Sequence, residues 1–539
     1  MVHNVTAATR LFDVMNLVAE DPRVEVIFTD PESSAFPDGT AEFLSSRGVR
    51  NLPWSSAITA HFDLAVAASH GHTLHQLDAP LIIVPHGMGY NKYLETGNRK
   101  PETGNRKPVF GLSDEWLLHQ GRVIATVLTL SHDEQLHRLA RDSPAAARHA
   151  RVVGDLVFDQ LTASAVRRDR YRRALGVLAD ETLVLVTSTW GPDSLLGAAA
   201  RLPESLGTRL PVDEFRIAVA VHPNVWWGHS PWQVRQWLRG CSRAGVTVLE
   251  HVDDWRATLV AADVVIGDHG SVSFYAAALG IPVLLAAAPE HAVAPDSPIG
   301  RFLRRAPRLT ADPGPAEQIR KVMADHDPGD LADLTSLTTS LPGDAPAALR
   351  TTIYDLLRLP EPATPADVSL LAAPRRPLPR CDSHLVHVTM AGPHDAHVVR
   401  YPAEQLHTEP SSPPLVVGSG ETSRRWHELA DVIVAEPEDG EPDRLTAALS
   451  RSPGAALATA PAKSGGWLVA DRHGTVVHAT GAGDLFAPVA LHAGAEGRAL
   501  RDLTGDWTIT AGGTSTAITV RAISPQADRG GPSARRRGR

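Results

Sequence analysis

Short apolar runs alternate with helical patterns along the first two thirds of the 539-residue chain, in two successive series. Buried strands that alternate with helices are typical of a parallel sheet covered on both faces. The sequence therefore predicts two doubly wound α/β domains in tandem, over residues 1–175 and 176–359. The expected strands lie at 24–30, 62–69, 81–87 and 123–131 in the first domain, and at 182–190, 215–223, 246–250, 262–268 and 282–288 in the second.

The two ends of this region carry further expectations. The chain begins MVHNVTAATRLFDVM, which reads as the end of a strand followed by an amphipathic helix. The first strand is therefore expected to be very short, or to begin upstream of Met1. A late helical pattern at 345–359 is expected to cross back to the first domain.

The remainder of the chain has a different character. Residues 360–380 are rich in proline and are predicted to form a linker. Residues 381–523 combine strand and hairpin patterns with a few helices, which predicts a small α+β domain of unknown role. Residues 524–539 contain a run of arginines among Gly, Pro and Ser, which indicates a disordered basic tail.

Charge and cysteine content narrow the function classes. The formal net charge is −9 with His neutral, which argues against a specific nucleic-acid partner bound by a basic surface. The two cysteines, Cys241 and Cys381, form no CxxC pair, so neither a zinc site nor a disulfide framework is indicated. No apolar run is long enough for a membrane span, and the N-terminus does not resemble a signal peptide. We expect a cytoplasmic protein, with peripheral contact to the inner membrane face as a further expectation.

The stretch VVIGDHGSVSFYAAALGIPVLL, residues 264–285, carries the sharpest local signal. A buried strand ends at Asp268, and a helix begins near Ser271. Ligands of open α/β sheets bind beyond the carboxyl ends of the strands, and a helix start offers free N–H groups to a phosphate. Gly270, Ser271, Val272 and Ser273 are therefore candidate phosphate-binding residues. The bland alternative is that Ser271 only caps its helix.

Two histidines occupy comparable positions in the two domains. His86 follows the predicted strand at 81–84 and is followed by Gly87, whereas His222 follows the strand at 215–221 and precedes Pro223. A lone histidine is usually structural or solvated. Two at equivalent strand ends, together with a phosphate-type loop, predict a shared cleft that they face.

Two further segments of the first domain carry clusters of basic residues or histidines. The heptapeptide ETGNRKP occurs at 95–101 and again at 102–108, and it adds Arg99, Lys100, Arg106 and Lys107. It is read mainly as a duplication in a surface loop, with a basic acceptor-binding loop as the alternative. The segment HGHTLH gathers His70, His72 and His75, but no second cluster supports a metal site there. Sequence motifs for a P-loop, HExxH and GxGxxG after a strand are absent, which weakens ATP, zinc-protease and NAD interpretations.

With these motifs in order, the chain over about residues 1–360 resembles the CDP-glycerol glycerophosphotransferase family. The resemblance rests on His86-Gly87, Ser131, Gly154 with Asp159, His222-Pro223, and the segment containing Asp268, Ser271, Val272, Phe274 and Pro282. It implies the GT-B fold, in which two Rossmann-like domains face a cleft. The small α+β domain lies outside it.

The resemblance also implies a reaction. A nucleotide-activated donor would transfer a polyol phosphate or a sugar to a hydroxyl of a polyol, glycan or lipid-linked acceptor, as in cell-envelope or secondary glycopolymer synthesis. His86 would be the general base, and His222 with the loop 270–273 would neutralise the donor phosphates. Asp268 is expected to orient His269 or to hold the loop. Gly87, Ser131 and Asp159 are further cleft candidates, and neither a cofactor nor a metal is implied.

Several positions depart from the family pattern. Met88, Ala220, Gly270 and Tyr275 stand where the family has Thr, Lys, Ser and an acid. Two alternatives therefore remain open: a nucleotide-sugar epimerase or hydrolase on the same fold, and a non-catalytic binding or scaffold module. The oligomeric state is not indicated.

Overall fold

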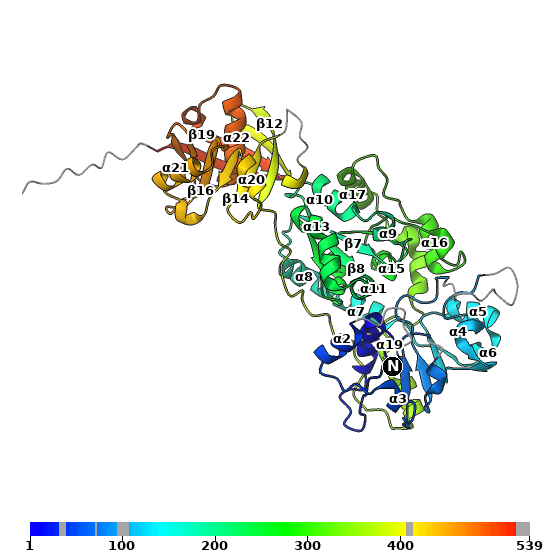
Figure 1. Cartoon of the computed structure of the whole chain (residues 1–539). Helices are drawn as coiled ribbons and strands as arrows, with labels where there is room; N and C mark the ends of the chain where they lie inside the picture. The colour runs from blue at the N-terminus through cyan, green and yellow to red at the C-terminus, as the bar shows by residue number, and fades with distance from the viewer. Residues whose placement is uncertain (32–38, 71–72, 94–106, 406–412, 524–539) are drawn as a thin grey trace, which may run out of the picture. The chain divides into compact units, whose positions relative to one another are not determined.

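The computed structural model describes residues 1–31, 39–70, 73–93, 107–405 and 413–523. The chain forms two compact units, which we describe separately (Figure 1). The first contains residues 1–210 and 215–379, and the second contains residues 211–214 together with the chain from Arg380 onward. None of the helices in the described ranges combines the length and apolar character needed to cross a membrane.

The first sheet of unit one is parallel, has the order β1-β2-β5-β6 and is built from short strands. These are β1 (Ala65–Ala67), β2 (Leu81–Ile83), β5 (Val127–Leu130) and β6 (Ala150–Val152). A small antiparallel pair, β3 (Leu118–His119) and β4 (Arg122–Val123), lies outside this sheet.

The predicted strand at 24–30 is wrong as a regular element. Only Phe28 pairs, in an isolated bridge with Asn51, because Phe28 is buried whereas Val24 and Val26 are only half-buried. Beside it, the backbone N–H of Val2 donates to Thr29 O, and the Met1 amino group donates to Val66 O. Helix α1 (Val5–Met15) then begins after Asn4, whose side chain caps it by accepting from Ala7 N. Met1 and Val2 are thus joined to β1 and to the segment at Thr29 by single backbone hydrogen bonds, and they form no regular strand before α1. We call the part of unit one built on this first sheet its first half, and the part built on the sheet described next its second half.

The second sheet is also parallel, and every strand predicted for it is present. Its order is β11-β10-β7-β8-β9. The strands are β7 (Thr182–Ser188), β8 (Phe215–Val221), β9 (Val246–Leu249), β10 (Val264–Gly267) and β11 (Val283–Leu285). Uninterrupted apolar runs predict such strands well because both faces of the sheet are covered.

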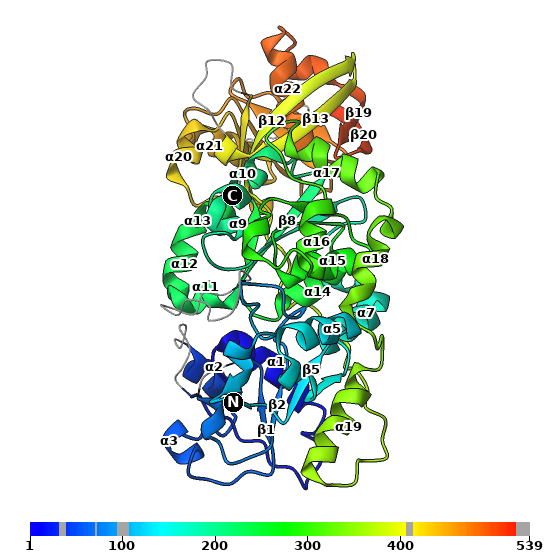
Figure 2. The same ribbon diagram turned by 90° about the vertical axis from the view of Figure 1, so that its right-hand side faces the viewer.

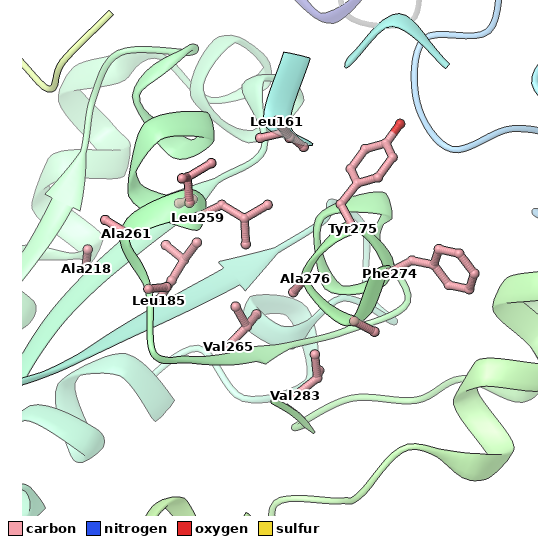
Figure 3. Packing of buried hydrophobic residues seen from close by; sticks show 14 of the residues in the cluster. Leu161, Leu185, Ala218, Leu259, Ala261, Val265, Phe274, Tyr275, Ala276 and Val283 are labelled. Atoms are coloured by element: carbon pink, nitrogen blue, oxygen red, sulfur yellow. The ribbon is translucent and has the colours of Figure 1, made fainter. Parts of the chain in front are cut away.

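Helices cover both sheets and join the two halves. Figure 3 shows Phe274, Tyr275 and Ala276 of α15 (Ser271–Ala278) in one hydrophobic cluster with Val265 of β10 and Val283 of β11. The remaining α-helices of unit one are α2 (Thr40–Ser46), α3 (Trp54–Ala57), α4 (Asp114–Leu117), α5 (Asp133–Asp142), α6 (Pro144–Ala147), α7 (Leu156–Ser164), α8 (Arg168–Ala174), α9 (Leu195–Ala198), α10 (Leu202–Arg209), α11 (Pro223–Gly228), α12 (Pro231–Trp237), α13 (Arg239–Arg243), α14 (Asp254–Ala261), α15 (Ser271–Ala278), α16 (Pro298–Arg305), α17 (Pro315–Ala324), α18 (Ala332–Thr335) and α19 (Ala345–Leu357).

Helix α19 returns to the first half, as predicted. Its buried residues Leu349, Ile353 and Tyr354 belong to the hydrophobic cluster of α1 and the first sheet, and Figure 2 shows the helix beside these elements. The Tyr354 hydroxyl also donates to Asp21 Oδ2 at 2.7 Å. The first half is therefore completed by a segment from the far end of the unit.

Unit two corrects the prediction of a simple α+β domain. Its nine strands form a closed barrel in the order β12-β13-β19-β20-β18-β17-β16-β15-β14. They are β12 (Ser383–Gly392), β13 (Asp395–Pro402), β14 (Leu415–Gly418), β15 (Val432–Val434), β16 (Leu457–Pro461), β17 (Trp467–Asp471), β18 (Val476–Ala479), β19 (Gly505–Ala511) and β20 (Thr514–Ala522). The barrel closes because β12 pairs with both β13 and β14, a pairing that strand periodicity does not reveal.

Three helices complete unit two: α20 (Arg424–Leu429), α21 (Pro442–Arg451) and α22 (Gly483–Ala495). Phe486 and Val489 of α22 are buried in one cluster with Trp507 of β19. Asp213, in the short segment that unit two takes from the middle of the chain, pairs with Arg400 of β13, and Arg400 also binds Asp484. The tail predicted at 524–539 lies outside the described residues.

Candidate functional site

A cavity of about 1270 Å³ lies between the two halves of unit one. Residues of both sheets' strand ends line it, which is where an open α/β sheet places its ligand. It brings together these sequence-predicted residues: His86, Gly87, His222, His269, Gly270, Ser271 and Val272. The two histidines predicted to share a cleft therefore do share one.

His86 is held in a single tautomer by its backbone contact. Its Nδ1 lies 3.2 Å from Ala68 O, and a carbonyl oxygen only accepts, so Nδ1 carries the proton. The neutral ring therefore has an unprotonated Nε2. Its ring is accessible to the cavity although protein surrounds it, and this enclosure, with the positive charge of Arg10, lowers its pKa to about 4. The ring is neutral at pH 7, with one nitrogen able to accept a proton.

His222 is held in the opposite tautomer. It is the N-cap of α11, and its Nδ1 accepts from the backbone N–H of Asn224 at 3.1 Å. The proton of the neutral ring therefore resides on Nε2. Burial lowers the pKa of His222 well below its usual value, and the charge of Lys92 acts in the same direction. One histidine thus offers an acceptor nitrogen and the other an N–H donor.

The start of α15 faces the cavity, but Ser271 does not cap it. Gly270 is the N-cap and makes no side-chain capping bond. The Ser271 hydroxyl instead accepts from the backbone N–H of Met88 at 3.0 Å, so it joins the second half to the first. The capping interpretation of Ser271 is therefore wrong, because a distant backbone donor takes the hydroxyl. The first N–H groups of the helix have no side-chain cap and remain suited to an anion.

Gly87 approaches the same contact closely. A Cβ on residue 87 would lie 2.7 Å from Ser271 Oγ but 3.6 Å from Ser271 Cβ. We expect Gly87→Ala to lower the free energy of unfolding by about 1–3 kcal/mol through overpacking, and Ser271→Ala by about 1 kcal/mol through the lost hydrogen bond. The double variant should lose less free energy of unfolding than the sum of the two single losses, because the oxygen that clashes with the new Cβ is gone. Urea unfolding of all four proteins measures this coupling, and additive costs would contradict the close approach.

Asp268 holds the loop rather than pointing into the cavity. Its carboxylate accepts from the backbone N–H groups of Thr189, Leu195 and Gly270 at 2.8–2.9 Å, and it is fully buried. Asp268 was expected either to orient His269 or to hold the loop, and these hydrogen bonds correspond to the second role. His269 lines the cavity, and burial lowers its pKa to about 3.

Besides Asp268, three further sequence candidates do not line the cavity. Ser273 is fully buried on the sheet side of α15 near Gly267. Ser131 is also buried, and its carbonyl accepts from Ser340 N at 3.0 Å. Asp159 accepts from the backbone N–H groups of Gly343 and Ala345, so it holds the start of α19. All three positions are structural in this arrangement.

Lys92 is a cavity residue that the motifs did not single out. Its segment leaves the first half and pairs with the second, through a bridge between Lys92 and Val293 and a bond from Tyr93 N to Ala292 O. The ammonium donates to Thr189 Oγ1 at 3.1 Å. Burial lowers the Lys92 pKa, and the charge of Asp268 opposes this shift. Lys92 thus supplies a cation although Ala220 stands where the family pattern has a lysine.

Tyr275 occupies the position where the family pattern has an acid, and its side chain reaches a carboxylate elsewhere in the chain. Its buried hydroxyl donates to Asp155 Oδ2 at 2.7 Å, and Asp155 caps α7 by accepting from Val157 N and Phe158 N. Burial raises the pKa of Tyr275 well above its usual value. The tyrosine hydroxyl is therefore bound to a carboxylate. That carboxylate belongs to a residue 120 positions earlier in the chain, so no local motif reveals it.

Parts of the ETGNRKP repeat and of the HGHTLH segment lie outside the described residues. Arg99, Lys100 and Arg106 of the repeat lie outside the described residues, as does His72. The ammonium of Lys107 lies 5.8 Å from the centroid of the Tyr93 ring. His70 lines the cavity, whereas His75 stacks on His119 with ring centroids 3.6 Å apart. In the part of the chain that the structure describes, no group of three His, Cys, Asp or Glu side chains is placed to hold a metal ion.

No family model and no curated protein matches the chain. Among solved structures, it is similar to the wall teichoic acid polymerase TagF soaked with CDPG, with 12% identity over 66% of this chain and 85% of that chain and a TM-score of 0.43. It is also similar to the Anabaena protein HepE in complex with UDP-glucose, with 15% identity over 67% of this chain and 97% of that chain and a TM-score of 0.38. Similarity of this extent does not identify an activity.

Proposed function

We propose that this chain is a transferase that moves a polyol phosphate or a sugar from a nucleotide-activated donor to a hydroxyl acceptor. The observation that carries the proposal is the pair of neutral histidines with opposite tautomers in one cavity. His86 presents an unprotonated Nε2, and His222 presents an Nε2–H. Such a pair can accept the proton of a hydroxyl and stabilise the charge of a departing phosphate at the same time.

The proposed reaction balances as follows. The acceptor oxygen forms a bond to the donor phosphorus, or to the sugar carbon attached to the donor phosphate, while its proton moves to His86 Nε2. The bond from that atom to the bridging phosphate oxygen breaks, and the nucleotide departs with the electron pair. The Nε2–H of His222 donates to an oxygen of the departing phosphate. Positioning and electrostatic stabilisation supply most of the acceleration.

The donor phosphates would lie between the α15 N-terminus and Lys92. The helix offers uncapped N–H groups at Ser271 and Val272, and Lys92 adds its ammonium group. The helix N-terminus, Lys92 and His222 together would neutralise the charge of the phosphates. The proposed binding therefore needs neither a metal ion nor an acidic side chain to hold one. The expected setting, a cytoplasmic enzyme of cell-envelope or secondary glycopolymer synthesis, is part of the same proposal.

Calorimetric titration of the full chain with CDP, UDP and GDP tests the proposal. We expect saturable binding of at least one nucleotide, and nucleotide release when the matching donor, CDP-glycerol or a UDP- or GDP-sugar, is supplied with a hydroxyl acceptor. A protein that binds none of the three would be a scaffold rather than a transferase. Binding without release of nucleotide from any donor would equally reject the transferase.

Removal of the Lys92 charge should weaken the donor specifically. A hydrogen bond to a charged group contributes about 1.5–3 kcal/mol, so Lys92→Met should raise the Kd of the bound nucleotide by about 10–100-fold. Lys321→Met is the matched control, because Lys321 is exposed, lies outside the cavity lining and pairs with Asp325 at 2.6 Å. Calorimetry on both variants measures the difference. Equal nucleotide affinity in the two variants would place the phosphates away from Lys92.

A further inference from the structure

Two buried histidines, His3 and His70, line the cavity. His3 is 3% exposed and His70 is 6% exposed, and both ring nitrogens of each lack a partner among the described residues. A buried polar group without a partner costs free energy, and it therefore needs an explanation. Neither residue takes part in the transfer chemistry proposed above.

The aromatic ring of Phe110 connects His70 to the proposed base. The ring of Phe110 makes edge contacts with His70 at 5.4 Å, with His86 at 6.4 Å and with Trp116 at 4.8 Å between centroids. All four rings line the same cavity. A ligand that fills this end would therefore lie beside His86 Nε2, where the acceptor hydroxyl has to be.

The charges beside His70 and Phe110 differ from those at the α15 N-terminus and Lys92, where the donor phosphates are proposed to bind. Asp114 and Glu115 line the cavity next to Trp116, and both would repel an anion. Burial lowers the pKa of His3 to about 4 and that of His70 to about 3, so both rings are neutral at pH 7. Arg10, the cation whose charge most lowers the pKa of His86, lies beside the Tyr275 hydroxyl, which binds Asp155. The negative charge of Asp155 thus lies close to this arginine.

The chemistry of this end matches hydroxyl groups. A neutral imidazole has one N–H donor and one acceptor nitrogen, and a hydroxyl group likewise donates and accepts. Aromatic rings pack against the C–H face of a sugar or polyol through apolar contact. We propose that His3, His70, Phe110 and Trp116 form the acceptor subsite, and that the acceptor group bound there is an uncharged sugar or polyol rather than a phosphate-bearing unit.

This inference rests on the proposed function, and the test separates the two. Saturation-transfer NMR on the full chain, in the presence of the nucleotide that calorimetry selects, measures the binding of glycerol, methyl glucoside and glycerol 3-phosphate. We expect at least one neutral probe to bind, with a lower Kd than glycerol 3-phosphate. His70→Phe keeps an aromatic ring and removes both nitrogens, so it should raise the Kd of the neutral probe at least tenfold while nucleotide affinity changes less than twofold.

His3→Phe provides a second variant at the same subsite, and His75→Phe is the matched control because His75 is exposed and does not line the cavity. Either subsite variant counts only if its thermal unfolding stays cooperative. If nucleotide binds but glycerol 3-phosphate binds better than both neutral probes, or if no neutral probe binds, the subsite proposal is rejected and the transferase stands. If the unchanged protein binds no nucleotide, the transferase itself is rejected.

Discussion

Replacing His86 by Asn is expected to lower the rate of transfer by about 10²–10⁴-fold, the usual contribution of a general base. Asn is the informative substitute because its amide N–H can replace the Nδ1–H that donates to Ala68 O. The variant loses the basic nitrogen while the local backbone contact is kept. The measurement is nucleotide release under single-turnover conditions, with the donor that binding experiments identify.

Nucleotide affinity should be unchanged in this variant, because the donor phosphates are assigned to α15, Lys92 and His222. His75→Asn, at an exposed ring outside the cavity, should retain the full rate. A His86→Asn protein that transfers at the normal rate would remove the base from the mechanism.

The pH profile gives an independent check on His86. Its pKa is lowered to about 4, so the ring stays neutral and basic as the pH falls below its usual value of 6.5. We therefore expect kcat/KM to be flat from pH 7 through 6 and to decline only as the pH approaches the lowered pKa. An acidic limb centred near 6.5 would show that His86 is fully hydrated or is not the base.

The parallel sheets were predictable from the sequence, and so was the place of the site. Five buried runs predict the second sheet because strands covered on both faces are apolar throughout. Parallel strands end at the same edge, so His222 and the loop after Asp268 had to lie near each other. His86 follows from the same rule in the first sheet, together with the prediction that the two domains share a cleft.

What the sequence did not reveal depends on distant pairs. Ser271 reads locally as a cap, yet its partner Met88 N is 183 positions away. Lys92 reaches the cavity only because its segment pairs with Val293, and Asp155 reaches Tyr275 across 120 positions. His3 carries no local motif, and the segment HGHTLH around His70 suggests a metal cluster rather than a place in the cavity. Closure of the barrel in unit two likewise depends on one pairing, that of β12 with β14.

Stability should fall steeply as the pH drops below 6.5. His3, His70 and His269 are each less than a tenth exposed, and burial lowers their pKa values to about 4, 3 and 3. Between those values and 6.5, the unfolded chain binds a proton at each site and the folded chain does not. Folding stability is therefore fully present above pH 6.5 and is lost as the pH falls towards 4.

The size of this effect follows from the shifts. At pH 5, one histidine with a folded pKa of about 4 or less costs about 2 kcal/mol relative to neutral pH. Three of them would remove about 6 kcal/mol, a large part of the 5–15 kcal/mol that typically stabilises a domain. Asp268 titrates in the opposite sense, because burial raises its pKa, and it offsets part of the loss. The remaining loss falls on unit one, which contains all four groups.

Urea unfolding at pH 7.5 and pH 5 measures this loss, and His70→Phe identifies its source. The variant has one fewer buried imidazole, so its loss between the two pH values should be about 2 kcal/mol smaller than that of the unchanged protein. His75→Phe should not change the loss, because His75 is exposed. Equal stability of the unchanged protein at both pH values would mean that water reaches these rings in solution. The cavity end that His3 and His70 line would then be hydrated and open, rather than a dry wall built for hydroxyl groups.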